Sequence, residues 1–125
     1  PQDYAKAVAW LRKAAEQGYA KAQASLGGMY DKGKGVLQDY AQAAAWYRKA
    51  AEQDLAEAQY NLGKMYGNGQ GVSQDYVQAH MWFNLAASLG YTDAAESRDS
   101  VADRMSTDQI AEAQTLAREW AAEHR

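Results

Sequence analysis

The sequence predicts an all-α fold in which about seven antiparallel helices stack into a solenoid. Residues 1–36 and 37–72 are identical at 23 of 36 aligned positions, and the same period returns a third time. Each period contains two stretches with helical spacing of apolar residues, and neither shows the alternation of a β-strand. Because one helix pair cannot bury its own apolar face, repeated pairs are expected to stack on their neighbours.

The first helix of the chain is expected over residues 3–17. Tyr4, Ala7 and Leu11 follow helical spacing, Asp3 stands at the N-cap position, and Gly18 follows as a helix stop. The same pattern predicts equivalent helices over 39–53 and 75–89.

The next helix is expected over residues 20–32, with Ala22, Leu26, Met29 and Tyr30 on one face. A Gly33-x-Gly35 segment ends it, as expected for a turn that needs glycine. Equivalent helices are predicted over 56–68 and 92–105. In the last of these, Arg98 and Asp99 replace the Leu-Gly pair of the earlier copies.

The C-terminal stretch departs from the repeat. Ser106 and Gln109 form a capping-box pattern, which predicts the start of a further helix. Its apolar stripe consists of Ile110, Ala113, Leu116, Ala117 and Trp120, and its opposite face is charged. We therefore divide the chain into a repeat array over 1–106 and a capping helix over 107–125, which closes the stack against solvent.

The composition excludes several classes of partner and chemistry. The 125 residues carry 13 Lys and Arg against 16 Asp and Glu, which argues against nucleic acid as the main partner. The sequence has no Cys, which removes disulfides, thiolate metal sites and Cys nucleophiles. No apolar run approaches the roughly 20 residues of a membrane span.

Two recurring sequence blocks carry a family resemblance. They are A-x-A-Q-x-x-L-G-x-M-Y-x-x-G-x-G-V and Q-D-Y-x-x-A-x-x-W-Y-x-K-A-A-E-Q. This pattern resembles the Sel-one-like repeat family of tetratricopeptide-like α/α solenoids, and the resemblance covers residues 1–105. It implies a right-handed superhelix whose concave groove binds a protein or peptide, in scaffolds and adaptors that are common in bacteria.

The family phase implies that the chain opens on the second helix of an upstream repeat. Its first residue is Pro and not Met, so we expect that any targeting segment is missing from this sequence. The compartment therefore stays open between the bacterial periplasm or exterior and the cytoplasm.

We expect no catalytic residue, no cofactor and no metal site. The Gly67-Asn-Gly69-Gln-Gly71 segment lacks a phosphate-binding signature and is expected to be a turn. His80 is expected to be a surface or packing residue, because no second ligand lies four residues away. An alternative is an enzyme that binds or hydrolyses β-lactams or muramyl peptides, as described for cysteine-rich relatives.

Positions that vary between the repeats are the candidates for partner contact. On the first helices of the family repeat they face away from the Leu-Met-Tyr stripe, and the resemblance places them in the inner groove. Tyr60, which replaces an alanine of the earlier copy, is expected to be an exposed anchor. The candidate contact residues are Lys21, Ala24, Ser25, Gly28, Asp31, Glu57, Tyr60, Asn61, Lys64 and Asn68.

Tryptophan recurs at one position of the repeat, as Trp10, Trp46 and Trp82, which predicts packing between repeats. The first copy lacks its upstream neighbour, so the apolar side around Tyr4, Trp10 and Leu11 is expected to be open. Such a surface tends to find a partner, which makes a homodimer through this N-terminal face a further hypothesis.

Overall fold

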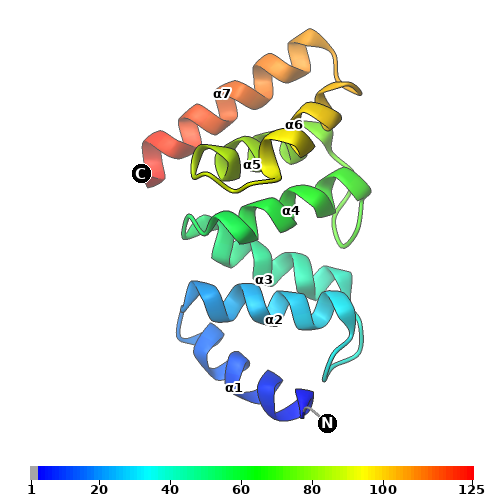
Figure 1. Cartoon of the computed structure of the whole chain (residues 1–125), viewed down its shortest axis with the longest axis vertical. Coiled ribbons are helices and arrows are strands. Elements are labelled where there is room, and N and C mark those ends of the chain that lie inside the picture. Colours follow the sequence, from blue (N-terminus) through cyan, green and yellow to red (C-terminus); the bar gives the residue numbers. More distant parts are fainter. Residues whose placement is uncertain (1–2) are drawn as a thin grey trace.

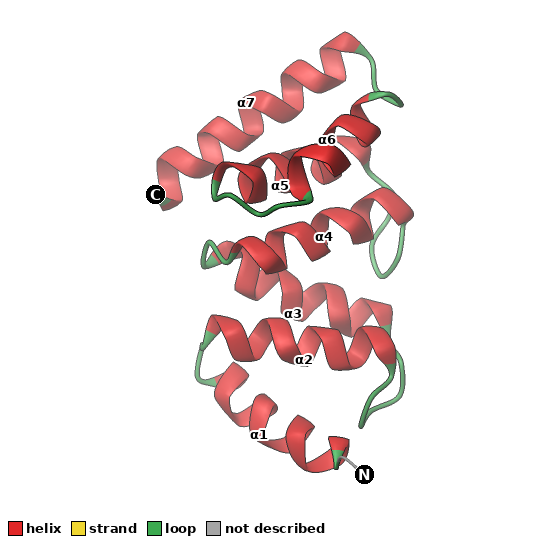
Figure 2. Cartoon of the chain, viewed as in Figure 1, coloured by secondary structure: helices red, strands yellow, loops and turns green. Residues whose placement is uncertain are grey.

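The structure, a computed structural model, describes residues 3–125, which form seven α-helices and no β-strand (Figure 2). The helices follow one another along a single stack, with α1 at one end and α7 at the other, and α7 runs back so that its C-terminal end lies toward the middle of the stack (Figure 1). The predicted all-α repeat solenoid is confirmed. The helices are α1 (Tyr4–Glu16), α2 (Ala20–Lys32), α3 (Tyr40–Glu52), α4 (Ala56–Asn68), α5 (Tyr76–Ser88), α6 (Ala94–Ala102) and α7 (Thr107–His124).

Side-chain caps fix where four of these helices begin. The carboxylates of Asp3, Asp39 and Asp75 each accept a hydrogen bond from the backbone N–H three residues further on. Ser106 and Gln109 form the expected capping box at the start of α7. Each cap satisfies a backbone donor that has no partner within the helix, which stabilises the helix by about 1 kcal/mol.

Glycine allows the paired helices to approach closely. A Cβ atom on Gly27 of α2 would lie 2.9 Å from the ring of Tyr47 on α3. A Cβ atom on Gly63 of α4 would lie 2.8 Å from the ring of Phe83 on α5. Both distances are too short for any real side chain, so glycine is the residue that lets each aromatic ring rest against the facing helix backbone.

The end of the stack departs from this pattern. Helix α6 has nine residues and is shorter than the expected 92–105, because the chain turns after Ala102 and Arg104 N–H bonds to the carbonyl of Val101. Asp99 stands in α6 where Gly63 stands in α4. Helix α7 packs against α5, where the Trp82 and Trp120 rings meet edge to face with centroids 5.6 Å apart.

The three repeated tryptophans differ in burial. Trp82 is 2% exposed, Trp46 is half-buried, and Trp10 is 75% exposed. The prediction that the repeated tryptophan packs between repeats is therefore confirmed for Trp82, which lies under α7. It is wrong for Trp10, whose ring is exposed in the described residues. The difference follows from position, since α1 is the first helix of the stack and Trp82 has helices on either side of it.

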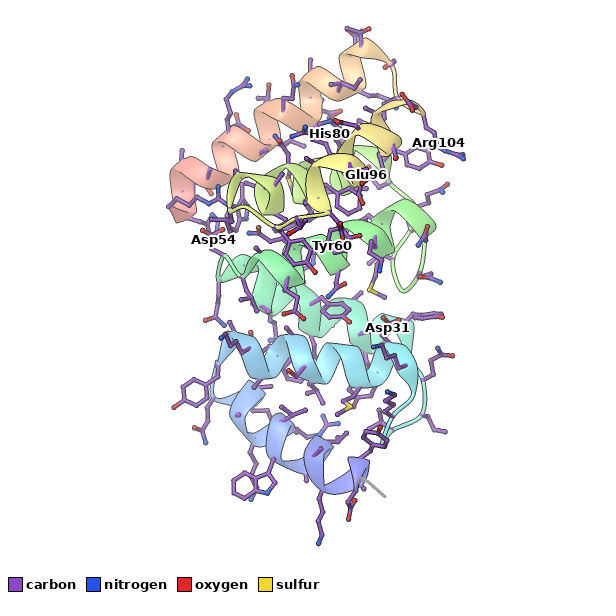
Figure 3. All side chains as sticks on the ribbon, in the orientation of Figure 1. Asp31, Asp54, Tyr60, His80, Glu96 and Arg104 are labelled. Carbon is purple, nitrogen blue, oxygen red and sulfur yellow. The ribbon has the colours of Figure 1, made fainter. Side chains whose placement is uncertain are left out.

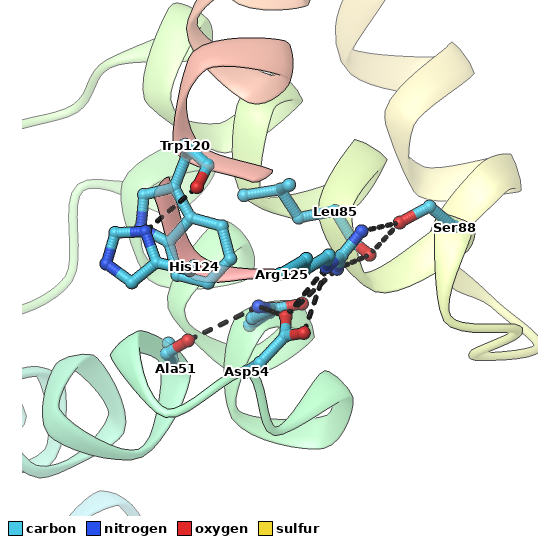
Figure 4. A network of polar contacts seen from close by, with 8 residues as sticks. Ala51, Asp54, Leu85, Ser88, Trp120, His124 and Arg125 are labelled. Atoms are coloured by element: carbon cyan, nitrogen blue, oxygen red, sulfur yellow. Dashed lines mark hydrogen bonds and ion pairs between the residues drawn. The ribbon is translucent and has the colours of Figure 1, made fainter. Parts of the chain in front are cut away.

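A polar contact joins the end of α7 to the turn between α3 and α4 (Figure 4). The Arg125 guanidinium donates to both carboxylate oxygens of Asp54, with Nε to Oδ2 at 2.9 Å and Nη2 to Oδ1 at 3.0 Å. It also donates to Ser88 Oγ and to the carbonyl of Leu85. Asp54 has φ 64°, and the equivalent turn residues, Gly18 and Gly90, are glycines.

This left-handed conformation carries a cost at Asp54 that glycine avoids, of about 1 kcal/mol. The ion pair and the hydrogen bond from Gln59 Nε2 offset it. Burial alone would raise the pKa of Asp54, but the hydrogen bonds from Arg125 and Gln59 outweigh burial and lower that pKa below its ordinary value.

We expect Trp82→Ala to lower the free energy of unfolding by about 3–5 kcal/mol, since it removes a fully buried indole. Trp10→Ala removes an exposed ring and is expected to change it by less than about 0.5 kcal/mol. Urea unfolding of both variants at neutral pH checks this. Equal midpoints for the two variants would contradict the packing described above.

Asp54 should make stability depend on pH. Its folded-state pKa lies below the value in the unfolded chain, so its contribution is complete above the unfolded pKa and is lost as pH falls through the folded pKa. Between pH 5 and pH 2 we therefore expect the free energy of unfolding to fall further for the native chain than for the Asp54→Asn variant. Asparagine is the substitution of choice because it tolerates positive φ. Parallel pH profiles for the two proteins would contradict this.

Candidate functional site

A concave pocket of about 650 Å³ lies between α4, α5 and α6. Helix α4 lines it with Tyr60, Lys64 and Asn68, and helix α6 lines it with residues spaced one turn apart, from the start of α6 to just beyond its end. Phe83 and Tyr76 of α5 complete the wall. Figure 3 shows Tyr60 and Glu96 on neighbouring helices and Arg104 beyond the end of α6. The α6 side of the pocket consists of Asp93, Glu96, Ser97, Ser100, Val101 and Arg104.

Aromatic rings form the apolar part of the pocket. The Tyr60 ring stacks on the Tyr91 ring at 4.8 Å between centroids and lies 5.5 Å from the Phe83 ring. The Tyr60 hydroxyl accepts a hydrogen bond from Ser97 Oγ at 3.5 Å, which joins α4 to α6. These contacts hold Tyr60 in one place, so its exposed part presents a positioned surface to the pocket.

One end of the pocket is acidic. Asp93 and Glu96 line it, and Asp93 makes no capping hydrogen bond although it stands at the N-cap of α6. Burial raises the pKa of Tyr91 above its ordinary value, and the negative charge of Glu57, the Tyr60 phenol and the negative charge of Asp93 raise it further. The carboxylates of Glu57 and Asp93 therefore lie near the Tyr60–Tyr91 stack.

The other end carries hydrogen-bond donors and a cation. Arg104 follows the end of α6, and Asn68 ends α4. The Tyr76 hydroxyl accepts a hydrogen bond from Gln74 Nε2 at 3.2 Å, so its own proton remains free to be donated. Lys64 lies between the two ends, with its ammonium 5.4 Å from the centroid of the Tyr60 ring.

The charged side chains of the pocket are not neutralised by one another. Within residues 3–125, the ion pairs are Arg98–Asp99 and Arg125–Asp54, and neither includes Lys64, Asp93, Glu96 or Arg104. Two acids and two bases therefore line one concavity with their charges available to a ligand.

The structure brings together three of the ten candidate contact residues, namely Tyr60, Lys64 and Asn68. The other seven lie outside this pocket: Lys21 and Ser25 are exposed on α2, Glu57 is exposed on α4, and Gly28, Asp31 and Asn61 are half-buried. Ala24, the seventh, is 6% exposed and belongs to the core.

Two expectations need correction. Ala24 cannot contribute a contact surface, because its short side chain ends within the packing between helices. Tyr60 occupies the equivalent position of the next repeat, and its longer side chain extends out of that packing. It is half-buried against Phe83 and Tyr91, and not freely exposed as we expected.

The candidate set missed the part of the pocket that α5 and α6 supply. Sequence comparison between repeats marks Glu96, Ser97 and Ser100 as variable positions, which is a usable signal. Phe83 and Arg104 also vary between the repeats, whereas Tyr76 recurs as Tyr4 and Tyr40. Variation alone therefore does not mark these residues, because their place in the pocket depends on how α5 and α6 pack beside α4.

Residues 3–125 contain no group of three or more His, Cys, Asp or Glu side chains arranged to hold a metal ion. His80 is 3% exposed on α5 and is a packing residue; burial, together with the charge of Arg98, lowers its pKa. Among the described helices, none combines the length and the apolar character that crossing a membrane requires.

The family model of the Sel1 repeat matches residues 1–19, 20–55 and 56–91. The chain belongs to the Sel1 repeat family. The matched residues end before α6, in agreement with the loss of the Leu-Gly pair there. A comparison with curated protein sequences gives no significant match.

Three solved structures resemble the chain over most of its length. The uropathogenic Escherichia coli protective antigen c5321, which displays an SLR fold, is 40% identical with a TM-score of 0.94 over 98% of this chain. A Sel1 repeat protein from Oxalobacter formigenes is 40% identical with a TM-score of 0.76 over 78% of the chain. Helicobacter pylori cysteine rich protein B is 33% identical with a TM-score of 0.70 over 73% of the chain.

These neighbours are longer than the chain compared here. The matched region spans 27% of the E. coli protein, 40% of the O. formigenes protein and 68% of the H. pylori protein. The similarity therefore concerns the repeat unit and its stacking, over a part of each neighbour.

Proposed function

We propose that this Sel1 repeat chain is a non-enzymatic interaction module, and that the pocket between α4, α5 and α6 binds a segment of a protein or peptide partner. The observation that carries the proposal is the combination in one concavity of a positioned aromatic surface and four charges that form no ion pair in residues 3–125. Aromatic anchors of this kind contribute much of the binding energy at protein interfaces.

The size and lining of the pocket suit such a ligand. A volume of about 650 Å³ lies within the range of sites that bind small molecules or a few residues of a peptide. The wall mixes aromatic rings with hydroxyls, amides and charges, which can contact both the backbone and the side chains of an extended segment.

Family membership supports the same function at a coarser level, since Sel1 repeats often serve as protein-interaction modules. The enzymatic alternative rests on the resemblance to cysteine-rich proteins, one of which is a structural neighbour. This chain has no Cys, so the feature that names those proteins is missing here. Turnover of the chromogenic β-lactam nitrocefin by the purified chain would support the enzyme and contradict the scaffold proposal.

We expect peptides selected from a random library to bind the chain saturably, and Lys64→Ala to weaken that binding by about two- to fivefold, because it removes one pocket charge. Tyr60→Phe keeps the ring but removes the hydroxyl that bonds Ser97, so a smaller loss is expected. Fluorescence anisotropy with labelled peptides measures both.

Lys21→Ala is the matched control, since Lys21 is an exposed lysine on α2 outside the pocket. Its affinity for the selected peptides should equal that of the native chain. The proposal fails if no peptide binds saturably, or if Lys21→Ala and Lys64→Ala have the same effect.

A homodimer through the N-terminal face stays a prediction, which the exposure of Trp10 favours. If α1 mediates self-association, sedimentation velocity should show a monomer–dimer equilibrium that depends on concentration, and Trp10→Ala should shift it toward monomer. A monomer at every concentration would contradict this hypothesis.

A further inference from the structure

The pocket between α4, α5 and α6 has its charges separated along α6. Asp93 stands before the first residue of α6, and Glu96 lies in its first turn. Arg104 lies two residues beyond its last residue. Eight positions separate Glu96 from Arg104, which at the helical rise of 1.5 Å per residue corresponds to roughly 12 Å.

Each end offers the chemistry of a distinct recognition site. At the acidic end, the Asp93 and Glu96 carboxylates can hold a cation through charge and hydrogen bonds. At the basic end, the Arg104 guanidinium, the Asn68 amide and the free Tyr76 proton can all donate to a carboxylate.

An extended peptide advances about 3.3 Å per residue, so four steps along it cover roughly 13 Å. A cationic side chain and a carboxylate four residues apart would therefore reach the two ends of the pocket together. Phe83 and Val101 add apolar surface to the same pocket.

We propose that the pocket selects extended peptide segments that carry a lysine or arginine and, four residues later, a carboxylate, with a small or apolar side chain between them. The cation binds beside Asp93 and Glu96, and the carboxylate binds at Arg104. This inference rests on the proposed peptide-binding function and adds the chemical class of the partner.

The probe is a five-residue peptide with blocked ends, with lysine first, glutamate fifth, and alanine, leucine and alanine between. One control peptide has the same composition with lysine and glutamate adjacent, and a second has glutamine in place of glutamate. Titration into the ¹⁵N-labelled chain, followed by NMR, measures even millimolar affinities and shows which resonances respond.

We expect the spaced peptide to bind about three- to tenfold more tightly than the peptide with adjacent charges, with shifts at pocket resonances. Arg104→Gln should weaken the spaced peptide by about the same factor and leave the glutamine peptide unchanged, because the coupling is between Arg104 and the glutamate. Asp93→Asn should likewise weaken binding of the spaced peptide, because it removes a charge that faces the peptide's lysine. The Asp93 side chain makes no capping hydrogen bond, so this substitution leaves the start of α6 without a lost contact. Arg118→Gln, an exposed change on α7, is the control and should have no effect.

Equal affinities for the spaced and adjacent peptides, or an equal effect of Arg104→Gln on the glutamate and glutamine peptides, would overturn the inference and leave the proposed function standing. Absence of saturable shifts with these peptides, while library-selected peptides still bind the pocket, would also overturn the inference alone. If the library peptides fail to bind as well, the proposed function fails with it.

Discussion

The close approach of glycine to an aromatic ring is the contact on which the rest of the structure depends. Gly27 admits Tyr47, and Gly63 admits Phe83, so the rings lie against the helix backbone and α2 packs on α3 as α4 packs on α5. A side chain at either glycine would force the facing ring or the helix that carries it to shift. The same Phe83 also faces Tyr60, so the contact that pairs α4 with α5 places the apolar wall of the candidate site.

The pocket lies where this repeated contact stops. Asp99 replaces the glycine in α6, and the next helix, α7, packs against α5. Helix α6 is therefore joined to its neighbours through α5 and through the bond from Ser97 to Tyr60, and its charged face borders a concavity. A loss of repeat regularity thus coincides with a pocket lined by four charged side chains that form no ion pair within residues 3–125.

The terminal contact between Asp54 and Arg125 shows a different compromise. A non-glycine residue adopts a left-handed conformation at Asp54, and a compensating interaction offsets its cost. The bidentate ion pair supplies it across 71 positions of sequence, and it connects α7 to the turn before α4. Helix α7 is thereby joined to the turn before α4 as well as to α5.

The sequence alone determined the repeat, the helix starts and the all-α fold, because the caps of Asp3, Asp39 and Asp75 and the period of 36 act through local contacts. It also predicted that Tyr60, Lys64 and Asn68 share one face of a helix, and all three line the pocket. Only the tertiary structure decided that Ala24 is buried and Trp10 is exposed. It also decided that Arg104 and Phe83 line the same pocket as Tyr60. The physical reason is that burial and pocket shape depend on which helices lie beside a residue, and the position of α7 against α5 follows from packing that no repeat pattern encodes.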